Sequence, residues 1–314
     1  YNYGYGVVGF DSDTSPEFIV LINKFFVPLF FIEIYFFYFF NSNRVIYFVN
    51  LFLFLFLTLY KGYTGPIVHL GYLFIFRLYF NGKLNIKTIF IIIFVGLLSS
   101  PIIRIIKNLI IRSFISGGTL SSELDVLYKI SDVDNFIELY YVYFQRVFER
   151  FELISATYFI IDKLDTIQKL YESNQFLPFY LYHWLPQTIE KILVLSPIYD
   201  ITQDSAQRII ASLINSGYQW QIHIGFFGWS IISPIESLFY FIYATTLIFI
   251  SLQLTKMIDL KNNSIEQLTW LLVLSFVTHG WYNDFILYIQ GLFIFLILVN
   301  IINTINFPKL KYMP

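Results

Sequence analysis

The chain of 314 residues is 57% hydrophobic and only 13% charged, whereas soluble domains average about 45–50% apolar and about 25% charged residues. This composition predicts an integral membrane protein. A net charge of −1 excludes a basic nucleic-acid-binding surface, and the lack of cysteine in the sequence excludes disulfide bonds, thiolate metal sites and thiol nucleophiles.

The predicted fold is all-α and polytopic, with an N-terminal extension over residues 1–17 and transmembrane helices over 18–119. Polar turns divide this part into apolar runs at 18–40, 45–60, 67–80 and 89–106. Pro28 and Glu33 interrupt the first run. We expect Pro101 and the basic residues that follow it to end the fourth.

The stretch from 120 to 177 changes character, because ten acidic and five basic residues fall within it. Apolar residues such as Leu139, Val142 and Tyr143 recur there at helical spacing. Two interpretations fit this pattern. One is a set of amphipathic helices that lie on the membrane or against partner subunits, and the other is a solvated helical insertion without chemistry.

Residues 178–314 are predicted to form C-terminal membrane helices that carry the functional residues. Their apolar segments cover 188–229, 234–258 and 265–307. The last segment has about forty residues, more than the roughly 20 that one perpendicular span needs. We therefore expect this last segment to be one strongly tilted or bent helix, so that two long, tilted helices in all lie near the C-terminus.

A polar stripe runs along the first of these segments. If residues 200–223 form one helix, six polar side chains fall within about 100° of one another. They are Asp204, Arg208, Ser212, Asn215, Gln219 and His223. An arginine in hydrocarbon costs at least about 2.5–3.5 kcal/mol, so it is kept with a partner or a water path. Arg208 therefore indicates either an ion pathway or a buried charge that pairs with Asp204 or Asp200 for orientation only.

A second polar face is predicted in the last segment, where His279, Asn283 and Gln290 share one side of a helix and Asp284 lies nearby. Two facing polar stripes, one with an arginine, fit the lining of an aqueous half-channel. Glutamine as a hydrogen-bond link between helices is the alternative. The four histidines of the sequence lack the spacing of a paired metal or haem site. We expect no cofactor beyond bound lipids.

The run Arg208-Ile-Ile-Ala-Ser-Leu-Ile-Asn-Ser-Gly217 resembles the arginine segment of subunit a, the proton channel of F-type ATP synthases. That family also carries a glutamine about two dozen residues before its C-terminus, as Gln290 does here. The resemblance implies a proton-translocating subunit of the Fo motor in the mitochondrial inner membrane. The richness in Phe and Tyr, with 37 and 25 residues, is likewise typical of an AT-rich organelle genome.

The resemblance also implies roles for individual residues. Arg208 would face the ionisable carboxylate of the rotating c-ring, with Gln290 beside it. The proton path would run along Ser212, Asn215, Gln219, His223, His279, Asn283 and Asp284, and Asp200, Asp204 and Glu190 would serve its matrix side. The implied partners are the c-ring, the other Fo and peripheral-stalk subunits and the lipid bilayer.

Three features depart from the family pattern. Ser212 stands in place of asparagine, Gly217 stands in place of glutamate or histidine, and 82 residues separate Arg208 from Gln290, about twice the family's distance. The extra length holds the apolar segment 234–258. One further membrane pass there would reverse the last helix, so we expect a re-entrant, in-plane or doubled-back segment.

A subunit of another respiratory complex is the alternative function. The same composition would suit a structural subunit, and the pair Trp281-Tyr282 is weakly similar to an aromatic pair of cytochrome oxidase subunit III. Polar side chains that find partners inside the chain would favour this alternative. A water-filled cavity that reaches Arg208 would favour proton transport.

Overall fold

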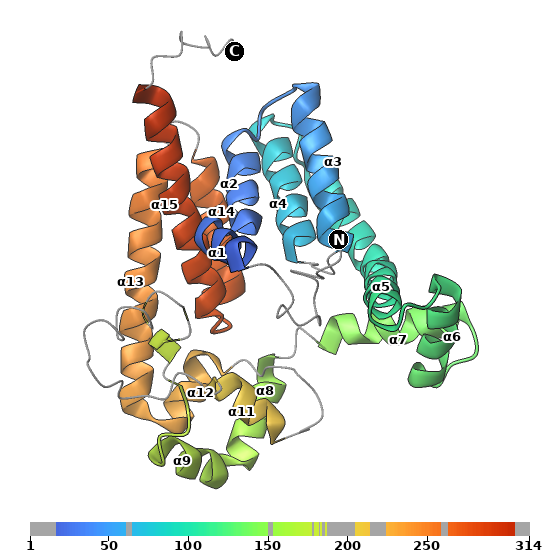
Figure 1. The fold of residues 1–314 in the computed structure, drawn as a ribbon, viewed down its shortest axis with the longest axis vertical. Helices are drawn as coiled ribbons and strands as arrows, with labels where there is room; N and C mark the ends of the chain where they lie inside the picture. Colours follow the sequence, from blue (N-terminus) through green and yellow to red (C-terminus); the bar gives the residue numbers. More distant parts are fainter. Residues whose placement is uncertain are drawn as a thin grey trace. The chain divides into compact units, whose positions relative to one another are not determined.

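The computed structural model describes residues 17–60, 65–149, 153–177, 179–181, 183, 186, 205–213, 224–258 and 263–304. Within these residues every regular element is a helix, and the one extended pairing is an isolated bridge between Leu177 and Ser205. The predicted all-α class is confirmed for this part of the chain. Contacts divide the protein into two compact units, Tyr1–Phe151 and Glu152–Pro314 (Figure 1). The domain boundaries expected from the sequence stay predictions.

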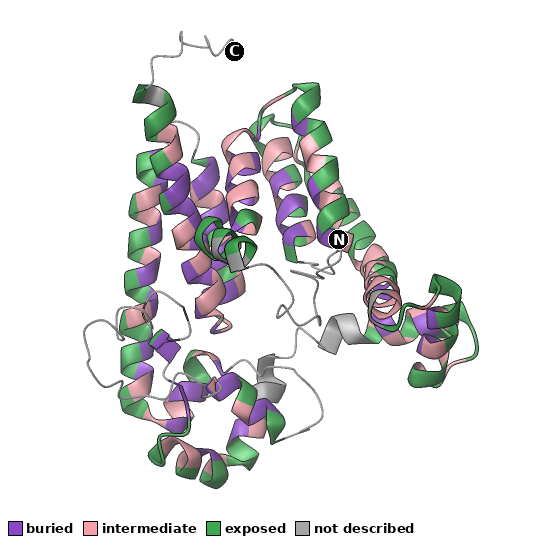
Figure 2. Cartoon of the chain, viewed as in Figure 1, coloured by how far each residue is buried: buried purple, intermediate pink, exposed green. Residues whose placement is uncertain are grey.

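Three of the described helices are long and apolar enough to cross a membrane, namely Ile86–Ser113, Pro234–Ile258 and Tyr282–Ile302. Large apolar side chains such as Phe94 and Phe249 are exposed on them. Figure 2 shows this exposed surface along α5 (Ile86–Ser116) and α13 (Pro234–Ile258). Because such surfaces are stable against lipid or other apolar chains, the helices indicate a membrane protein. The number of passes and the identity of the membrane stay predictions.

The first predicted span is broken in its middle. Helix α1 (Glu17–Phe26) ends before Val27, and α2 (Pro28–Tyr38) begins with proline at its first position. Val27 has a φ of 44° and a ψ of 62°, a left-handed conformation that β-branched residues rarely adopt. The expected span over 18–40 is therefore corrected to two helices, because Pro28 has no N–H with which to continue α1.

Three apolar helices of the first unit pack in pairs: α2, α3 (Val45–Tyr60) and α4 (Gly65–Phe80). Helices α3 and α4 correspond to the predicted runs at 45–60 and 67–80. The hydroxyl of Tyr47 on α3 donates a hydrogen bond of 3.2 Å to the Phe36 carbonyl of α2. Such a contact ties neighbouring helices together without leaving a buried hydroxyl unsatisfied.

Aromatic pairs set the register of α2 on α4. Phe37 stacks on Tyr72 with an interplanar angle of 22°, and the rings of Phe40 and Phe76 have centroids 4.9 Å apart. Each residue lies about 35 positions before its partner in the sequence. Because this separation stays nearly constant along the two helices, α2 and α4 run parallel. Figure 1 shows them side by side.

Helix α5 is 31 residues long and continues through Pro101. The expectation that Pro101 and the following basic residues end this helix is therefore wrong. The Asn85 side chain caps its start by accepting a backbone N–H, and Gly117, with a φ of 69°, ends it. Pro101 removes one hydrogen bond from the helix. The Tyr140 hydroxyl donates to the carbonyl of Leu98 at 2.9 Å, less than one turn earlier, and adds a polar contact there.

Helices α6 (Leu120–Ser131) and α7 (Phe136–Glu149) fold back against α5. The three helices share a small core made of Ile105, Leu127, Leu139 and Tyr143. The helical spacing predicted for Leu139 and Tyr143 is confirmed, since both are buried in this core. We call α6 and α7, together with the end of α5 that they contact, the elbow. Contact of the elbow with a membrane surface or a partner stays a prediction.

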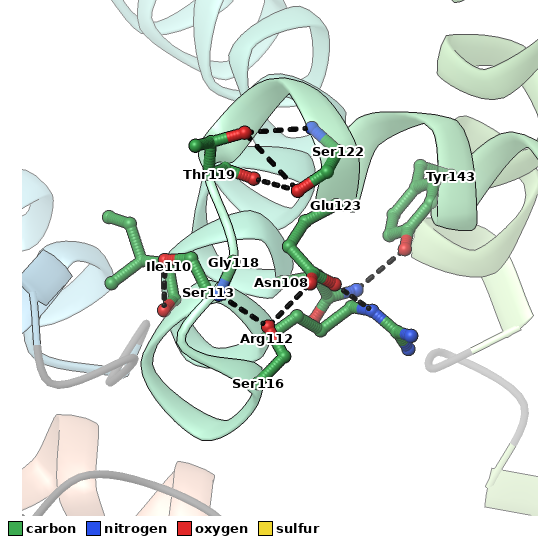
Figure 3. Close-up of polar contacts among 10 residues, drawn as sticks. All are labelled: Asn108, Ile110, Arg112, Ser113, Ser116, Gly118, Thr119, Ser122, Glu123 and Tyr143. Carbon is green, nitrogen blue, oxygen red and sulfur yellow. Dashed lines mark hydrogen bonds and ion pairs between the residues drawn. The ribbon is translucent and has the colours of Figure 1, made fainter.

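Glu123 is the polar centre of the elbow (Figure 3). Its carboxylate accepts hydrogen bonds from Ser116 at 2.5 Å and from Arg112 at 3.1 Å, and Asn108 donates to the Tyr143 hydroxyl at 2.6 Å. The Ser116 hydrogen bond, opposed by burial and assisted by Arg112, lowers the pKa of Glu123. Ionised Glu123 therefore stabilises the elbow at neutral pH, and this contribution is lost as the pH falls through the lowered pKa.

The second unit begins with α8 (Leu153–Asp162) and α9 (Leu164–Glu172), which pack against α12 (Gly225–Ile232). The short helices η2 (Phe179–Leu181) and α11 (Ala206–Ser212) lie between them in the sequence. Together α6, α7, α8 and α9 are the helices predicted for 120–177, and they divide between the two units.

Helix α13 is a single helix of 25 residues that packs against α12, α14 (Ser264–Leu272) and α15 (Tyr282–Thr304). The expectation of a re-entrant or doubled-back segment over 234–258 is wrong, because the one proline, Pro234, stands at the first position, where a helix tolerates it. At 1.5 Å per residue α13 is about 37 Å long, enough to cross a bilayer core. An in-plane placement stays a prediction.

The last apolar segment forms two helices where we expected one tilted or bent helix. After α14, a π-helical stretch, η3 (Val273–Val277), leads to a turn and then to α15. Gly280 has a φ of 83° and donates its N–H to Val277, while Trp281 donates to Phe276. This is the Schellman pattern, in which a left-handed glycine ends a helix. The last apolar segment is therefore two helices and not one, because Gly280 ends the first of them.

The two arms on either side of this turn form an antiparallel hairpin. The hydroxyls of Thr269 and Tyr288 lie 2.7 Å apart, and each residue is about nine positions from the turn. Both side chains are fully buried. Thr269 donates to the Ile265 carbonyl at 2.9 Å, so the Tyr288 hydroxyl is left to donate to Thr269.

Gly280→Ala is expected to destabilise the second unit. A φ of 83° costs an L-residue about 1–2 kcal/mol, and an added Cβ would lie 2.8 Å from the Tyr240 hydroxyl and 3.2 Å from the Gly225 nitrogen. Gly96→Ala on α5 is the matched control, because its Cβ position is open and alanine favours a helix by about 0.5–1 kcal/mol. Thermal unfolding in detergent, followed by circular dichroism, measures both. Equal midpoints would contradict the role given to this turn.

Candidate functional site

Half of the residues predicted for the site lie in the described part of the second unit. They are Arg208, Ser212, His279, Asn283, Asp284 and Gln290. The others, Glu190, Asp200, Asp204, Asn215, Gln219 and His223, lie outside the described residues. Of the helix predicted over 200–223, the structure describes only residues 205–213, which contain α11.

Helix α11 carries the first half of the predicted site. Ser205 caps it, since its hydroxyl accepts the Arg208 N–H. Gln207 is buried and donates to the Gly280 carbonyl at 2.9 Å. Arg208 and Ser212 are exposed. Because consecutive helical positions point about 100° apart, Gln207 fastens α11 to the turn before α15 while Arg208 lies at the surface of the unit.

His279 lies in the turn that precedes α15, so the expectation that it shares a helical face with Asn283 and Gln290 is wrong. Its Nδ1 is 3.0 Å from the Thr278 hydroxyl. Asn283 and Asp284 belong to the first turn of α15. Asp284 thus lies at the N-terminal end of α15, where the helix dipole favours a negative charge.

Gln290 contacts a residue that the sequence did not place in the site. His183 is 1% exposed, and its side chain hydrogen-bonds Gln290 of α15. Burial lowers the pKa of His183 to about 4, and the hydrogen bond with Gln290 opposes this shift. His183 is therefore neutral at pH 7. The sequence shows a histidine in an aromatic stretch with no spaced partner, so only the fold reveals this contact.

The segment that carries His183 is anchored by aromatic rings. The ring centroid of Phe179 lies 5.9 Å from that of Trp229 on α12. It lies 5.3 Å from that of Tyr240 on α13 and 6.0 Å from that of Tyr282 on α15. The isolated bridge between Leu177 and Ser205 joins the same segment to the start of α11. Leu177 and Phe179 therefore contact α12, α13, α15 and the start of α11, and they place His183 against α15.

The two halves of the site are attached to α15 at different levels. Gln207 binds the turn at Gly280, before α15 begins. Gln290 lies eight residues after Tyr282, about 12 Å further along the helix axis. The predicted approach of Arg208 to Gln290 within a few ångströms stays a prediction.

No protein family model, no curated protein and no solved structure matches this chain. Among the described residues, no group of three or more His, Asp or Glu side chains is placed to hold a metal ion. The chemistry available to the site comes from one guanidinium, neutral amides, imidazoles and a carboxyl group. Amides and neutral imidazoles both donate and accept hydrogen bonds, so they can order water, and an imidazole can also pass a proton.

His183 makes the stability of the second unit depend on pH. Its pKa is about 4 in the folded protein and near its ordinary 6.5 in the unfolded chain, so the unfolded chain binds the proton first as the pH falls. Stability is therefore retained above pH 6.5 and decreases by about 3 kcal/mol between 6.5 and 4. His183→Gln should flatten this dependence, and Tyr180→Phe, a neighbour, should retain it. Thermal midpoints between these pH values provide the measurement, and identical profiles for both variants would contradict the assignment.

Proposed function

We propose that the protein is a proton-conducting membrane subunit of the kind represented by subunit a of F-type ATP synthases, and that it works against a c-ring in the mitochondrial inner membrane. The buried contact of His183 with Gln290 of α15 carries the proposal. Polar groups are costly in apolar surroundings and mark ion and proton pathways in membrane proteins. Both groups can donate and accept hydrogen bonds, so Gln290 can order water and the His183 ring can pass a proton.

The polar residues of the hairpin support the proposal by their order along α15. Asn283 and Gln290 are seven residues apart, which is about two turns, so they lie on one face of the helix. Asp284 and His279 lie at the end of the hairpin that the turn forms. A proton that enters at this end meets hydrogen-bonding groups at two levels of the same helix face.

Arg208 supplies the fixed positive charge. It is exposed on α11, and its neighbour Gln207 holds the helix at the base of α15. An arginine close to a carboxylate of the ring favours the ionised form of that carboxylate, which therefore releases its proton on approach and cannot carry it past. A membrane potential of 100 mV contributes about 2.3 kcal/mol for each charge that crosses.

Isolation of the native complex in mild detergent tests the proposal directly. The chain is expected to co-migrate with the α, β and c subunits of an ATP synthase. ATP hydrolysis by that complex should be blocked by an inhibitor that modifies the carboxylate of the c-ring. Co-migration with subunits that carry haem and copper would overturn the proposal.

Arg208→Ala is expected to reduce ATP-driven proton pumping to background, because no fixed charge then forces the ring carboxylate to release its proton. Arg44→Ala is the matched control, since Arg44 is an exposed arginine of the other unit and should leave pumping unchanged. Quenching of a pH-sensitive dye in vesicles that contain the complex measures the rate. Normal pumping by an assembled Arg208→Ala complex would contradict the role of Arg208.

One observation favours the alternative, a structural subunit of another respiratory complex. Helix α13 is apolar on all sides, with Tyr240 and Leu247 buried and Phe239 and Phe249 exposed. Such a helix is more typical of a membrane span than of an in-plane helix, which has a polar face. If α14 does not return across the membrane, a span at α13 would give α15 the direction opposite to that of the last helix in the ATP synthase family.

Because the sequence contains no cysteine, single introduced cysteines can locate the ends of α13. Ser233→Cys and Asn263→Cys place one thiol directly before the helix and one after it. The proton-channel proposal predicts that a membrane-impermeant maleimide labels both thiols from the same side. Labelling from opposite sides would favour the structural alternative, and labelling of both after solubilisation is the control for reactivity.

A further inference from the structure

A turn with two exposed lysines joins α4 to α5 in the first unit. We call residues 81–87 the basic turn. Lys83 lies between the two helices, and Lys87 belongs to the first turn of α5. Neither lysine side chain forms an ion pair with any residue that the structure describes. The basic turn plays no part in the site of the second unit.

The backbone of the basic turn is held by both helices. Gly82, with a φ of 65°, donates its N–H to Tyr79, and Lys83 donates to Leu78, which is the Schellman pattern that ends α4. The Asn85 side chain then caps the start of α5. The two lysines are therefore fixed at the point where a helix long and apolar enough to cross a membrane begins.

Arg77, one turn before the end of α4, is used by the fold itself. Its guanidinium donates to the Ser42 carbonyl at 3.2 Å and to the Asn43 side chain, and it lies 5.4 Å from the ring centroid of Phe48 on α3. These contacts fasten the α2–α3 connection to α4, and Figure 1 shows the two together at one end of the bundle. Arg77 thus has protein partners, whereas the two lysines keep their charges at the surface.

This part of the sequence has no acidic residue that could neutralise the lysines. No Asp or Glu occurs between Glu33 and Glu123. Glu33 is the one acid of α2 to α5, and it is fully buried with Nδ1 of His69 on α4 only 3.0 Å from its carboxylate. The basic turn is therefore a positively charged surface that attracts anions.

Apolar side chains beside the lysines favour a lipid over a soluble anion. Ile86, Phe90, Phe94 and Leu98 stand at every fourth position of α5, and all four are exposed. Because residues four apart are neighbours on a helix surface, they form one apolar ridge that starts at the basic turn. Tyr79, just before the turn, is 69% exposed, and tyrosines of this kind are enriched in the headgroup layer of a membrane.

We propose that Lys83 and Lys87 bind the phosphate group of an anionic phospholipid, whose acyl chains lie along the apolar ridge of α5. An ammonium group offers a full positive charge and three donors to phosphate oxygens. Lysine side chains at the end of a membrane helix reach the headgroup layer while their methylene groups stay on apolar surface. Zwitterionic lipids carry a cation of their own, so the two lysines select lipids by net charge. This surface stands independently of the function proposed for the second unit.

Native mass spectrometry of the full chain, released from detergent with phosphatidylglycerol and phosphatidylcholine of the same acyl chains, tests the proposal. The unaltered chain is expected to retain phosphatidylglycerol in preference. The double variant Lys83→Gln, Lys87→Gln should reduce this preference by at least about fivefold, the factor that one lysine near a membrane surface contributes. Lys83→Arg with Lys87→Arg should keep the preference, because the charges are kept.

Lys129→Gln is the matched control. It removes one exposed lysine of α6 in the same unit, where the exposed acids Asp125 and Asp132 lie close in sequence, and it should leave the preference unchanged. Equal retention of the two lipids by the unaltered chain would overturn the proposal and leave the lysines as a contact for an acidic segment of another protein. A preference that the double glutamine variant keeps would overturn it as well. So would displacement of the lipid by inorganic phosphate but not by chloride at equal ionic strength, since the lysines would then bind a soluble anion.

Discussion

Every polar group that this apolar chain buries needs a partner, because an unsatisfied hydrogen-bonding group or charge in such surroundings costs several kcal/mol. Some buried hydroxyls, such as those of Thr58 and Ser251, donate to carbonyls of their own helix, and other partners come from other helices or segments. Glu33 pairs with His69 across α2 and α4, and Thr269 pairs with Tyr288 across the hairpin. Gln290 of α15 meets His183 from the segment after α9. These contacts determine which helices are neighbours, and they also place titratable groups inside the protein.

Long apolar runs gave reliable helix predictions. The runs at 45–60 and 234–258 became α3 and α13 with matching bounds, because a run of that length and composition is stable only as a helix in apolar surroundings. The breaks were harder to predict. Pro28 is tolerated at a helix start and disruptive inside one, and Gly280 stands in an apolar run where glycine also occurs within helices. Only the left-handed backbone of Val27 and Gly280 resolves these ambiguities.

In the candidate site, the sequence predicted contacts within one helix but not contacts between distant segments. Gln290 and Asn283 could be placed on one face from their spacing, because both belong to one helix. His183 could not be placed, since its contact depends on how Leu177 and Phe179 pack against α12, α13, α15 and the start of α11. Gln207 was missed for the same reason, although it is the residue that fastens the arginine helix to the base of α15.

The central claim is that Arg208 faces the carboxylate of a rotating ring, and a cysteine cross-link tests it most directly. The chain has no cysteine of its own, so Arg208→Cys introduces one thiol, and a second is placed next to the ring carboxylate in the c subunit. Oxidation of the assembled complex is predicted to join the two chains in one disulfide-linked product. An assembled complex in which no such product forms, while cysteines at other positions of the ring surface do react, would contradict the account.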